Sequence, residues 1–329
     1  MQMKSILFLL AMLCCVALRA ADYSEPMQKE FTVNGKPDLM LRNSDGLITI
    51  TPIEGSTVHV KVTKEIRNAK DDAHAKSDAE KISIEMEQIG NQIRVITHWP
   101  QNNFSLGLGH HSSKQVRFEI ETPVESNVDA SVSDGELYVT GVKGTMDLKT
   151  SDGSISARDL GGDLSLRSSD GKIQLQNSSG KMSIRLSDGK LVSENCTGSI
   201  HIDSGDAKIT LTGFNGDAEF TNSDGDVDID GVLKSINGRV SDGSMHVKVA
   251  QGSVMENEWL LRASDGSITV DLPQGFSADL DLTTSDGHLQ TDHPISVTGS
   301  LSPHHLSGKL GDGGHTLQIK TSDGNIAIK

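Results

Sequence analysis

The chain has 329 residues, with 45 acidic against 30 basic side chains, 33 glycines and only 3% aromatic residues. The formal net charge of −15 argues against nucleic acid as a partner, because binding to nucleic acid depends on Lys and Arg that neutralise phosphates. The low aromatic content argues against stacking platforms for sugars or bases, and the glycines indicate many turns in two domains or one elongated repeat structure.

The N-terminal segment, residues 1–20, has the features of a secretory signal peptide. Lys4 is followed by an apolar run over residues 6–18 and then by small residues. This run is too short to span a bilayer comfortably and is typical of a removable export signal. A lipoprotein anchored at Cys14 or Cys15 is the alternative, which the residues before these cysteines disfavour. We expect an exported protein in the periplasm, outside the cell or on its surface, with no transmembrane segment in the mature chain.

Residues 21–130 predict a β-rich capping region that precedes a set of repeats. Within it, residues 71–82 are short and polar, and they predict a surface or capping helix. Apolar or alternating runs predict strands at residues 39–41, 47–51, 58–62, 82–86, 93–97 and 116–120.

The tripeptide Ser-Asp-Gly occurs ten times and marks an internal repeat. Between residues 133 and 241 its copies recur with an 18-residue spacing, with one degenerate copy in register at residues 205–207. Gly takes positive φ in such turns and Asp bonds nearby backbone. We therefore predict structural turn roles for Gly135, Gly153, Gly171, Gly189, Gly225 and Gly243.

Residues two and four positions after each turn glycine are apolar and their neighbours polar, as at Ile155 and Ala157. This alternation predicts short, half-buried strands. One further inward column recurs once per repeat: Val142, Leu160, Ser178, Cys196, Phe214 and Val232. Cys196 is therefore expected in the core, because the sequence signals no base that would activate a catalytic thiol.

Two short strands in each repeat fit two architectures. An antiparallel meander would leave an apolar face and two sheet edges uncovered. We therefore predict an all-β fold, a parallel β-solenoid whose 18-residue coils each give one strand to each of two facing sheets. The regular block covers residues 131–250. Residues 251–329 form irregular coils and a cap, with a strand at residues 325–329 that closes the far end.

The order of these features resembles the bacterial family of putative adhesins, which are exported β-repeat proteins classed as a domain of unknown function. The likeness runs through residues 43–46 (N-S-D-G), residues 121–124 (E-T-P-V) and residues 321–329 (TSDGNIAIK), and it covers nearly the whole mature chain. The resemblance implies export, a β-repeat fold and adhesion to a cell surface or matrix.

The aspartates of the repeated turns form the most suggestive polar column: Asp134, Asp152, Asp170, Asp188, Asp206, Asp224 and Asp242. Stacked carboxylates repel one another, and a ladder of Ca²⁺ ions is one way to relieve this. We favour turn chemistry without metal, because the calcium-binding nonapeptide pattern is missing and Lys172, Lys190 and Lys208 follow the turns. The pairs His110–His111 and His304–His305 lack the spacing of a zinc motif.

No catalytic or cofactor-binding residue is predicted. Few aromatics and almost no loop insertions in the regular block disfavour a polysaccharide-active β-helix enzyme, whose carboxylates need a partly buried cleft.

The outward rows of side chains remain as a contact surface. Arg167, Lys181 and Arg185 are expected close together on one sheet, and Asp226, Asp228 and Asp230 on the other. We expect a secreted, non-catalytic binding surface, an adhesin by resemblance, whose partner is a protein or glycan of the cell envelope or surface. A periplasmic scaffold or envelope-sensing protein is the alternative.

Overall fold

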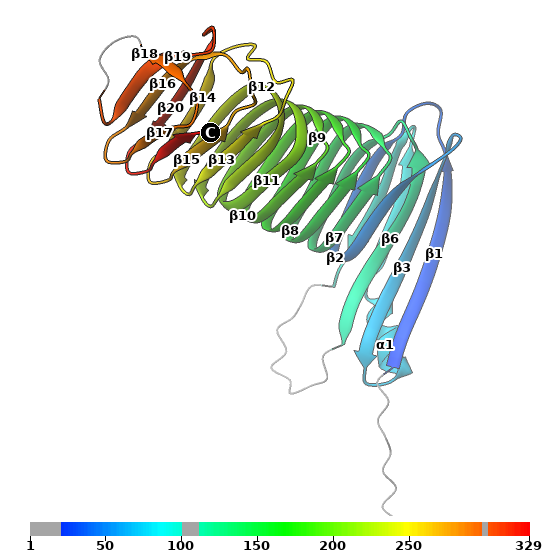
Figure 1. Cartoon of the computed structure of the whole chain (residues 1–329). Helices are drawn as coiled ribbons and strands as arrows, with labels where there is room; N and C mark the ends of the chain where they lie inside the picture. Colours follow the sequence, from blue (N-terminus) through cyan, green and yellow to red (C-terminus); the bar gives the residue numbers. More distant parts are fainter. Residues whose placement is uncertain (1–20, 101–111, 298–301) are drawn as a thin grey trace, which may run out of the picture.

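A computed structural model describes residues 21–100, 112–297 and 302–329, which form one mixed β-sheet with a single short helix (Figure 1). The predicted all-β class and the short helix near the N-terminus are confirmed. The predicted signal peptide, residues 1–20, lies outside the described residues, as does the His110–His111 pair.

The N-terminal part of the chain leaves the stack of strands and then rejoins it. Its elements are β1 (Ala21–Thr32), β2 (Asp38–Ile53), β3 (Thr57–Ala69), α1 (Asp72–Glu80), β4 (Ser83–Ile89), β5 (Gln92–His98), β6 (Ser113–Pro123) and β7 (Asn127–Thr140). β2 pairs in parallel with β7 over most of its length, with β5 at one end and with β6 at the other. The antiparallel pairs β1–β3, β3–β6 and β4–β5 extend the sheet beyond β2.

Helix α1 begins where the Asp71 side chain accepts a hydrogen bond from the backbone N–H of His74, which caps the first turn. The helix packs on β3 and β1 through Ala75 and Ala79. Lys64 of β3 lies buried beneath it and donates to the Ala79 carbonyl oxygen at 3.2 Å. A cation at the C-terminal end of a helix is favourable, so Lys64 helps to fix α1 on the sheet.

The central strands follow one another along a single axis. They are β8 (Lys143–Arg158), β9 (Gly161–Gln176), β10 (Ser179–Glu194), β11 (Thr197–Asp224), β12 (Val227–Asp242) and β13 (Met245–Val249). Successive strands pair in parallel, and residues one repeat apart in the sequence, such as Leu148 and Leu166, lie side by side. Most of these strands continue through a Ser-Asp-Gly turn, because the chain bends there without losing its pairing. The hydrogen bonds therefore give one continuous mixed sheet, which differs from the two separate parallel sheets predicted.

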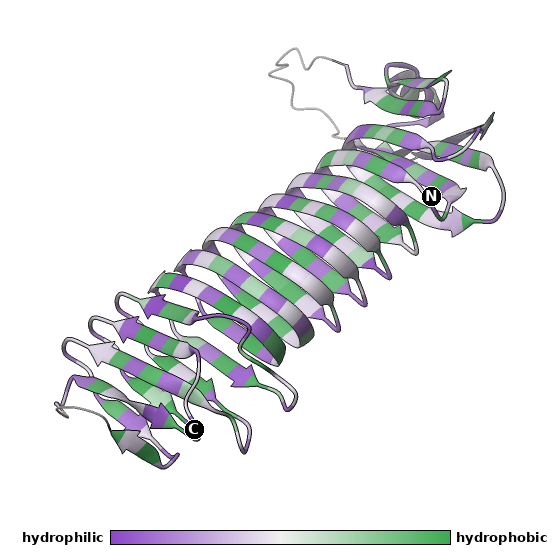
Figure 2. Ribbon diagram, turned by 90° about the horizontal axis from the view of Figure 1, so that it is seen from above, coloured by the Kyte–Doolittle hydropathy of each residue, from purple (hydrophilic) through white to green (hydrophobic). Residues whose placement is uncertain are grey.

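Inward side chains form a single apolar core along the stack, and Figure 2 shows the alternation of apolar and polar residues along each strand. Leu166, Ile184 and Cys196 are fully buried. The predicted inward position of Val232 is wrong. The register between β11 and β12 shifts after Thr212, so Leu233 is fully buried and Val232 is only half-buried.

The C-terminal strands do not stack in the order of the sequence. They are β14 (Trp259–Ala263), β15 (Ile268–Asp271), β16 (Ala278–Thr284), β17 (Leu289–Thr291), β18 (Ile295–Val297), β19 (His305–Leu310), β20 (Thr316–Thr321) and β21 (Ile326–Ile328). β20 lies between β14 and β16, and β21 lies between β15 and β17. The expectation that residues 325–329 close the far end is therefore wrong. β19 and β18 lie beyond β16 instead.

Candidate functional site

The aspartates of the repeated turns lie in one row. Register pairs join Asp134 to Asp152, Asp170 to Asp188, Asp188 to Asp206 and Asp224 to Asp242, and Asp45 extends the row by pairing with Asp134. Burial and the next carboxylate along raise the pKa of Asp45, of Asp224 and of Asp265, whose neighbours are Asp242 and Asp323. Neighbouring carboxylates in this row therefore repel one another.

Among residues 21–100, 112–297 and 302–329, no three His, Cys, Asp or Glu side chains are gathered so that they could hold a metal ion. The calcium ladder and the turn-chemistry interpretation both stay predictions. The second histidine pair of the sequence is His304–His305. The Nδ1 atom of His305 lies 3.1 Å from the Thr283 hydroxyl oxygen.

The turn glycines approach the backbone of the preceding turn very closely. A Cβ atom on Gly153 would lie 1.9 Å from the carbonyl oxygen of Gly135, and one on Gly171 would lie 1.9 Å from that of Gly153. Gly225 and Gly243 have φ of +108° and +150°, which L side chains rarely adopt. The expected positive φ is wrong for Gly135, Gly153 and Gly171, which lie outside the left-handed region, so the close approach is what favours glycine there. A Cβ on Gly153 or Gly171 would therefore require the turn to shift, whereas the degenerate copy accommodates Ala207 at the equivalent place, in register with Gly189.

A polar residue just before several Ser-Asp-Gly turns was missed by the sequence analysis. Asn222 is buried, and its Nδ2 donates to the carbonyl oxygens of Ala207 at 3.0 Å and Gly225 at 2.8 Å. Thr284 and Thr321 donate in the same way to turn carbonyls at 2.9 Å. The signal was a small polar residue at a position where the alternation requires an inward apolar one.

The outer face of β7 to β11 carries an open groove of about 650 Å³, which we call the Arg–Ser groove. Its cationic side is a row of three partners in register, Lys149, Arg167 and Arg185. Its other side is the first residue of four successive Ser-Asp-Gly turns: Ser133, Ser151, Ser169 and Ser187. Lys149 and the serine row were not singled out from the sequence, although their regular spacing was readable there.

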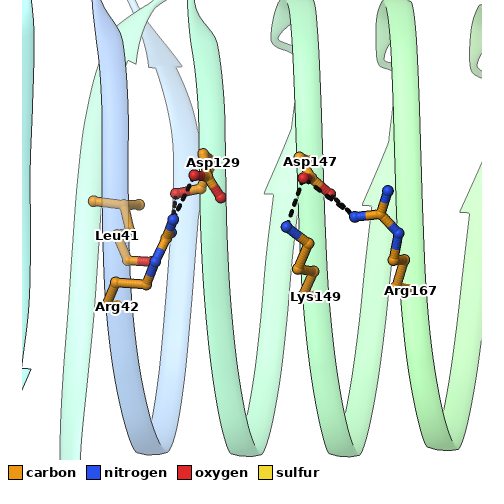
Figure 3. Close-up of polar contacts among 6 residues, drawn as sticks. All are labelled: Leu41, Arg42, Asp129, Asp147, Lys149 and Arg167. Atoms are coloured by element: carbon orange, nitrogen blue, oxygen red, sulfur yellow. Dashed lines mark hydrogen bonds and ion pairs between the residues drawn. The ribbon is translucent and has the colours of Figure 1, made fainter.

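One carboxylate holds two of the three cations in place. Asp147 lies 2.6 Å from the Lys149 ammonium and 3.0 Å from the Arg167 guanidinium (Figure 3). Burial alone would raise the pKa of Asp147, but the hydrogen bond and charge of Lys149 and the charge of Arg167 outweigh it and lower the pKa. Arg185 lies 3.6 Å from Asp203, which His201 also contacts.

The groove can therefore offer N–H and O–H donors at steps of about 4.8 Å, the spacing between neighbouring strands. Arg42 of β2 and Asp129 of β7 repeat the cation–carboxylate contact between these paired strands, and Arg42 also donates to the Asp129 carbonyl oxygen at 2.8 Å (Figure 3). A ligand with acceptor oxygens repeated along its length would match such a row.

The other predicted surface residues are only partly brought together. Arg167 and Arg185 are register partners, whereas Lys181 lies two rows away and lines a separate depression of about 410 Å³ with Glu219 and Glu258. The predicted acidic strand is balanced by lysines. Asp230 lies 2.7 Å from Lys248, and Asp228 lies 3.9 Å from Lys208.

Searching the described ranges for membrane-spanning segments gives none, since no helix there has the length and apolar character needed to cross a bilayer.

The family model named Toastrack DUF4097 matches residues 37–258 and residues 233–329. These matches cover most of the chain, so the chain belongs to the Toastrack DUF4097 family, a domain of unknown function.

Several solved structures are similar to this chain at low identity. A putative adhesin from Parabacteroides distasonis is 9% identical, with a TM-score of 0.43 and coverage of 93% of this chain and 97% of that one. A putative adhesin from Parabacteroides merdae is 11% identical, with a TM-score of 0.38 and coverage of 93% and 96%. A putative lipid binding protein from Parabacteroides distasonis is 11% identical, with a TM-score of 0.35 and coverage of 92% and 96%. No curated protein matches the chain.

Proposed function

We propose that this protein is an exported, non-catalytic β-solenoid that acts by contact, binding a protein or glycan of the cell envelope or surface as an adhesin does. In this proposal each sequence repeat is one coil with two outward faces. The observation that carries the proposal is the Arg–Ser groove, where three successive strands present Lys149, Arg167 and Arg185 in register beside a row of serines.

Repetition makes such a surface suited to an extended partner. Each strand adds an equivalent set of donors, so a ligand that lies along the groove gains contacts one after another within a single encounter. Each contact is exposed and individually weak, because surface ion pairs contribute little by themselves. Affinity would therefore come from the number of strands engaged.

The carboxylate beside the groove suits binding better than catalysis. A general acid needs a pKa raised toward the working pH, whereas the pKa of Asp147 is lowered by its two cationic neighbours. Asp147 would instead hold Lys149 and Arg167 in a fixed direction, which reduces the cost of ordering them when a ligand binds.

The test compares the binding of purified proteins to intact bacterial cells and to extracts of their envelopes. The groove variant carries Lys149→Ala, Arg167→Ala and Arg185→Ala. Its matched control carries Lys172→Ala, Lys190→Ala and Lys208→Ala, which removes the same charge from another row of exposed side chains.

We expect the groove variant to bind about tenfold more weakly, which corresponds to a loss of about 1.4 kcal/mol of binding free energy. The control should bind like wild type. Both variants should keep the wild-type melting temperature within a few degrees. Equal loss of binding in both variants would mean that only net charge matters. Full binding by the groove variant would show that the Arg–Ser groove is not the binding surface.

A further inference from the structure

The strand pair β20 and β21 lies in the stack between strands that are not its neighbours in the sequence. The chain forms β14 and β15, then β16 to β19, and only then returns to place β20 and β21 between these two groups. We call residues 316–328 the inserted strand pair. Both of its edges are hydrogen-bonded, so it fills a slot with strands on either side.

The slot holds the inserted strand pair by contacts that any equivalent strand pair could make. Leu317 and Ile319 are fully buried, in register with the inward residues of β14 on one side and β16 on the other. Thr321 donates to the Gly266 carbonyl oxygen, and Thr284 donates to the Gly324 carbonyl oxygen, both at 2.9 Å. These bonds join three successive Ser-Asp-Gly turns.

The three strand pairs at the slot share the same turn. Ser-Asp-Gly begins at Ser264, at Ser285 and at Ser322, with a small residue before each copy. Glycine stacks on glycine through the slot, because a Cβ on Gly324 would lie 1.9 Å from the Gly266 oxygen and one on Gly287 would lie 1.8 Å from the Gly324 oxygen. The strands on either side of the slot therefore contact the Ser-Asp-Gly turn and the buried side chains of the inserted strand pair. A second copy of the chain offers the same turn and the same buried side chains.

A glycine-rich connection leads into the inserted strand pair. β19 and β20 lie on opposite sides of β16, so residues 311–315 pass around the beginning of β16. Gly311, Gly313 and Gly314 have φ of +58°, +79° and +142°, and this connection lies mostly at the surface. Glycine adopts many other backbone conformations at little cost, so this connection can also run outward to a second molecule.

From this topology we propose that the inserted strand pair exchanges between two copies of the chain, so that residues 316–328 of each copy fill the slot of the other. Every contact inside the slot is then preserved and only residues 311–315 change conformation, as in domain swapping. The two open edges of an empty slot also favour recapture of a strand pair over solvent exposure.

The test uses single-cysteine variants of the mature protein in a Cys196→Ala background. One protein carries Arg262→Cys and the other, with a tag that changes its size, carries Lys320→Cys. Arg262 and Lys320 are register partners on β14 and β20, and neighbouring strands place Cα atoms about 4.8 Å apart, within reach of a disulfide. The mixture is incubated under native conditions, oxidised and resolved by size without reductant.

A second pair, Asp281→Cys with Gln318→Cys, probes the other side of the slot through β16 and β20. The control pair combines Arg262→Cys with Lys248→Cys, an exposed position on β13 that is no register partner of Arg262. We expect several-fold more mixed dimer from both slot pairs than from the control. Mixed dimer at the control level in both slot pairs would overturn the proposal, because any crosslinking would then come from random collision.

Discussion

At Gly153, glycine is required by close contact between neighbouring backbones. Gly153→Ala would place a Cβ 1.9 Å from the Gly135 oxygen, and backbone on both sides leaves little room to move. We expect a loss of unfolding free energy of about 2 kcal/mol or more, the range of overpacked cores. Denaturant unfolding measures it.

Gly161→Ala is the matched control, since its Cβ would meet only the flexible Lys143 side chain at 3.3 Å. We expect little change there. Similar losses at both positions would show that the close approach between turns is not the cause.

The aspartate row predicts a stability that depends on pH. Burial and the carboxylates of Asp206 and Asp242 raise the pKa of Asp224. The folded state therefore takes up this proton more readily than the unfolded chain, so the group favours folding at low pH and loses that contribution as pH rises through the folded pKa. Asp224→Asn should raise the melting temperature at pH 7 by a few degrees and give no gain at pH 3.

The control for this substitution is Asp163→Asn, which removes the same charge at an exposed position away from the row. An equal gain from both variants at pH 7 would point to net charge alone. A lower melting temperature for Asp224→Asn at pH 7 would contradict the repulsion.

At the scale of elements, one carboxylate links helix α1 to the neighbouring sheet. Burial would raise the pKa of Asp78, but hydrogen bonds from Lys81, Ser112 and Lys114 outweigh it and lower the pKa to about 2. The side chain is 19% exposed, so these contacts are only partly screened by solvent. Lys114 lies in the part of β6 that extends beyond β2, so its contact with Asp78 ties the helix to the end of the sheet.

A lowered pKa means that Asp78 stabilises the fold above about pH 4 and that this contribution is lost as pH falls through about 2. Asp78→Asn should cost up to about 2 kcal/mol at pH 7 and almost nothing at pH 2. Urea unfolding at the two pH values checks this, with Glu80→Gln on the same helix as a control. A cost that does not change with pH would exclude the charge as its source.

The regular strands could be predicted from the sequence because the constant spacing of the repeat fixes both their register and their inward rows. That is why Leu166, Ile184 and Cys196 lie where the alternation places them. The order of the C-terminal strands could not be predicted. Three Ser-Asp-Gly turns offer the same steric fit, so the motif does not indicate the order in which these turns stack.

The candidate groove could be predicted from the sequence only in part, for a related reason. Arg167 and Arg185 stood out as charges, but the role of Asp147 in holding Lys149 and Arg167 depends on side-chain directions across two strands. The N-terminal excursion posed a similar problem. β2 pairs with β7 although β3, α1, β4, β5 and β6 all come between them in the sequence, and no local pattern signals such a contact.

At the scale of the whole molecule, an acidic chain places cations in rows on a long face. The net charge is −15, yet Lys149, Arg167 and Arg185 follow one another on successive strands. Such an arrangement lets a ligand meet a local surface that differs from the average field of the protein.

The central claim is tested most directly by asking whether the protein is displayed on the outside of the cell. A small epitope inserted at Gly252, an exposed turn with open space around it, can be labelled with an antibody on intact and on permeabilised cells. We expect labelling of intact cells, at a level close to that after permeabilisation. Labelling only after permeabilisation would contradict the claim, because a protein confined within the envelope cannot act as an adhesin.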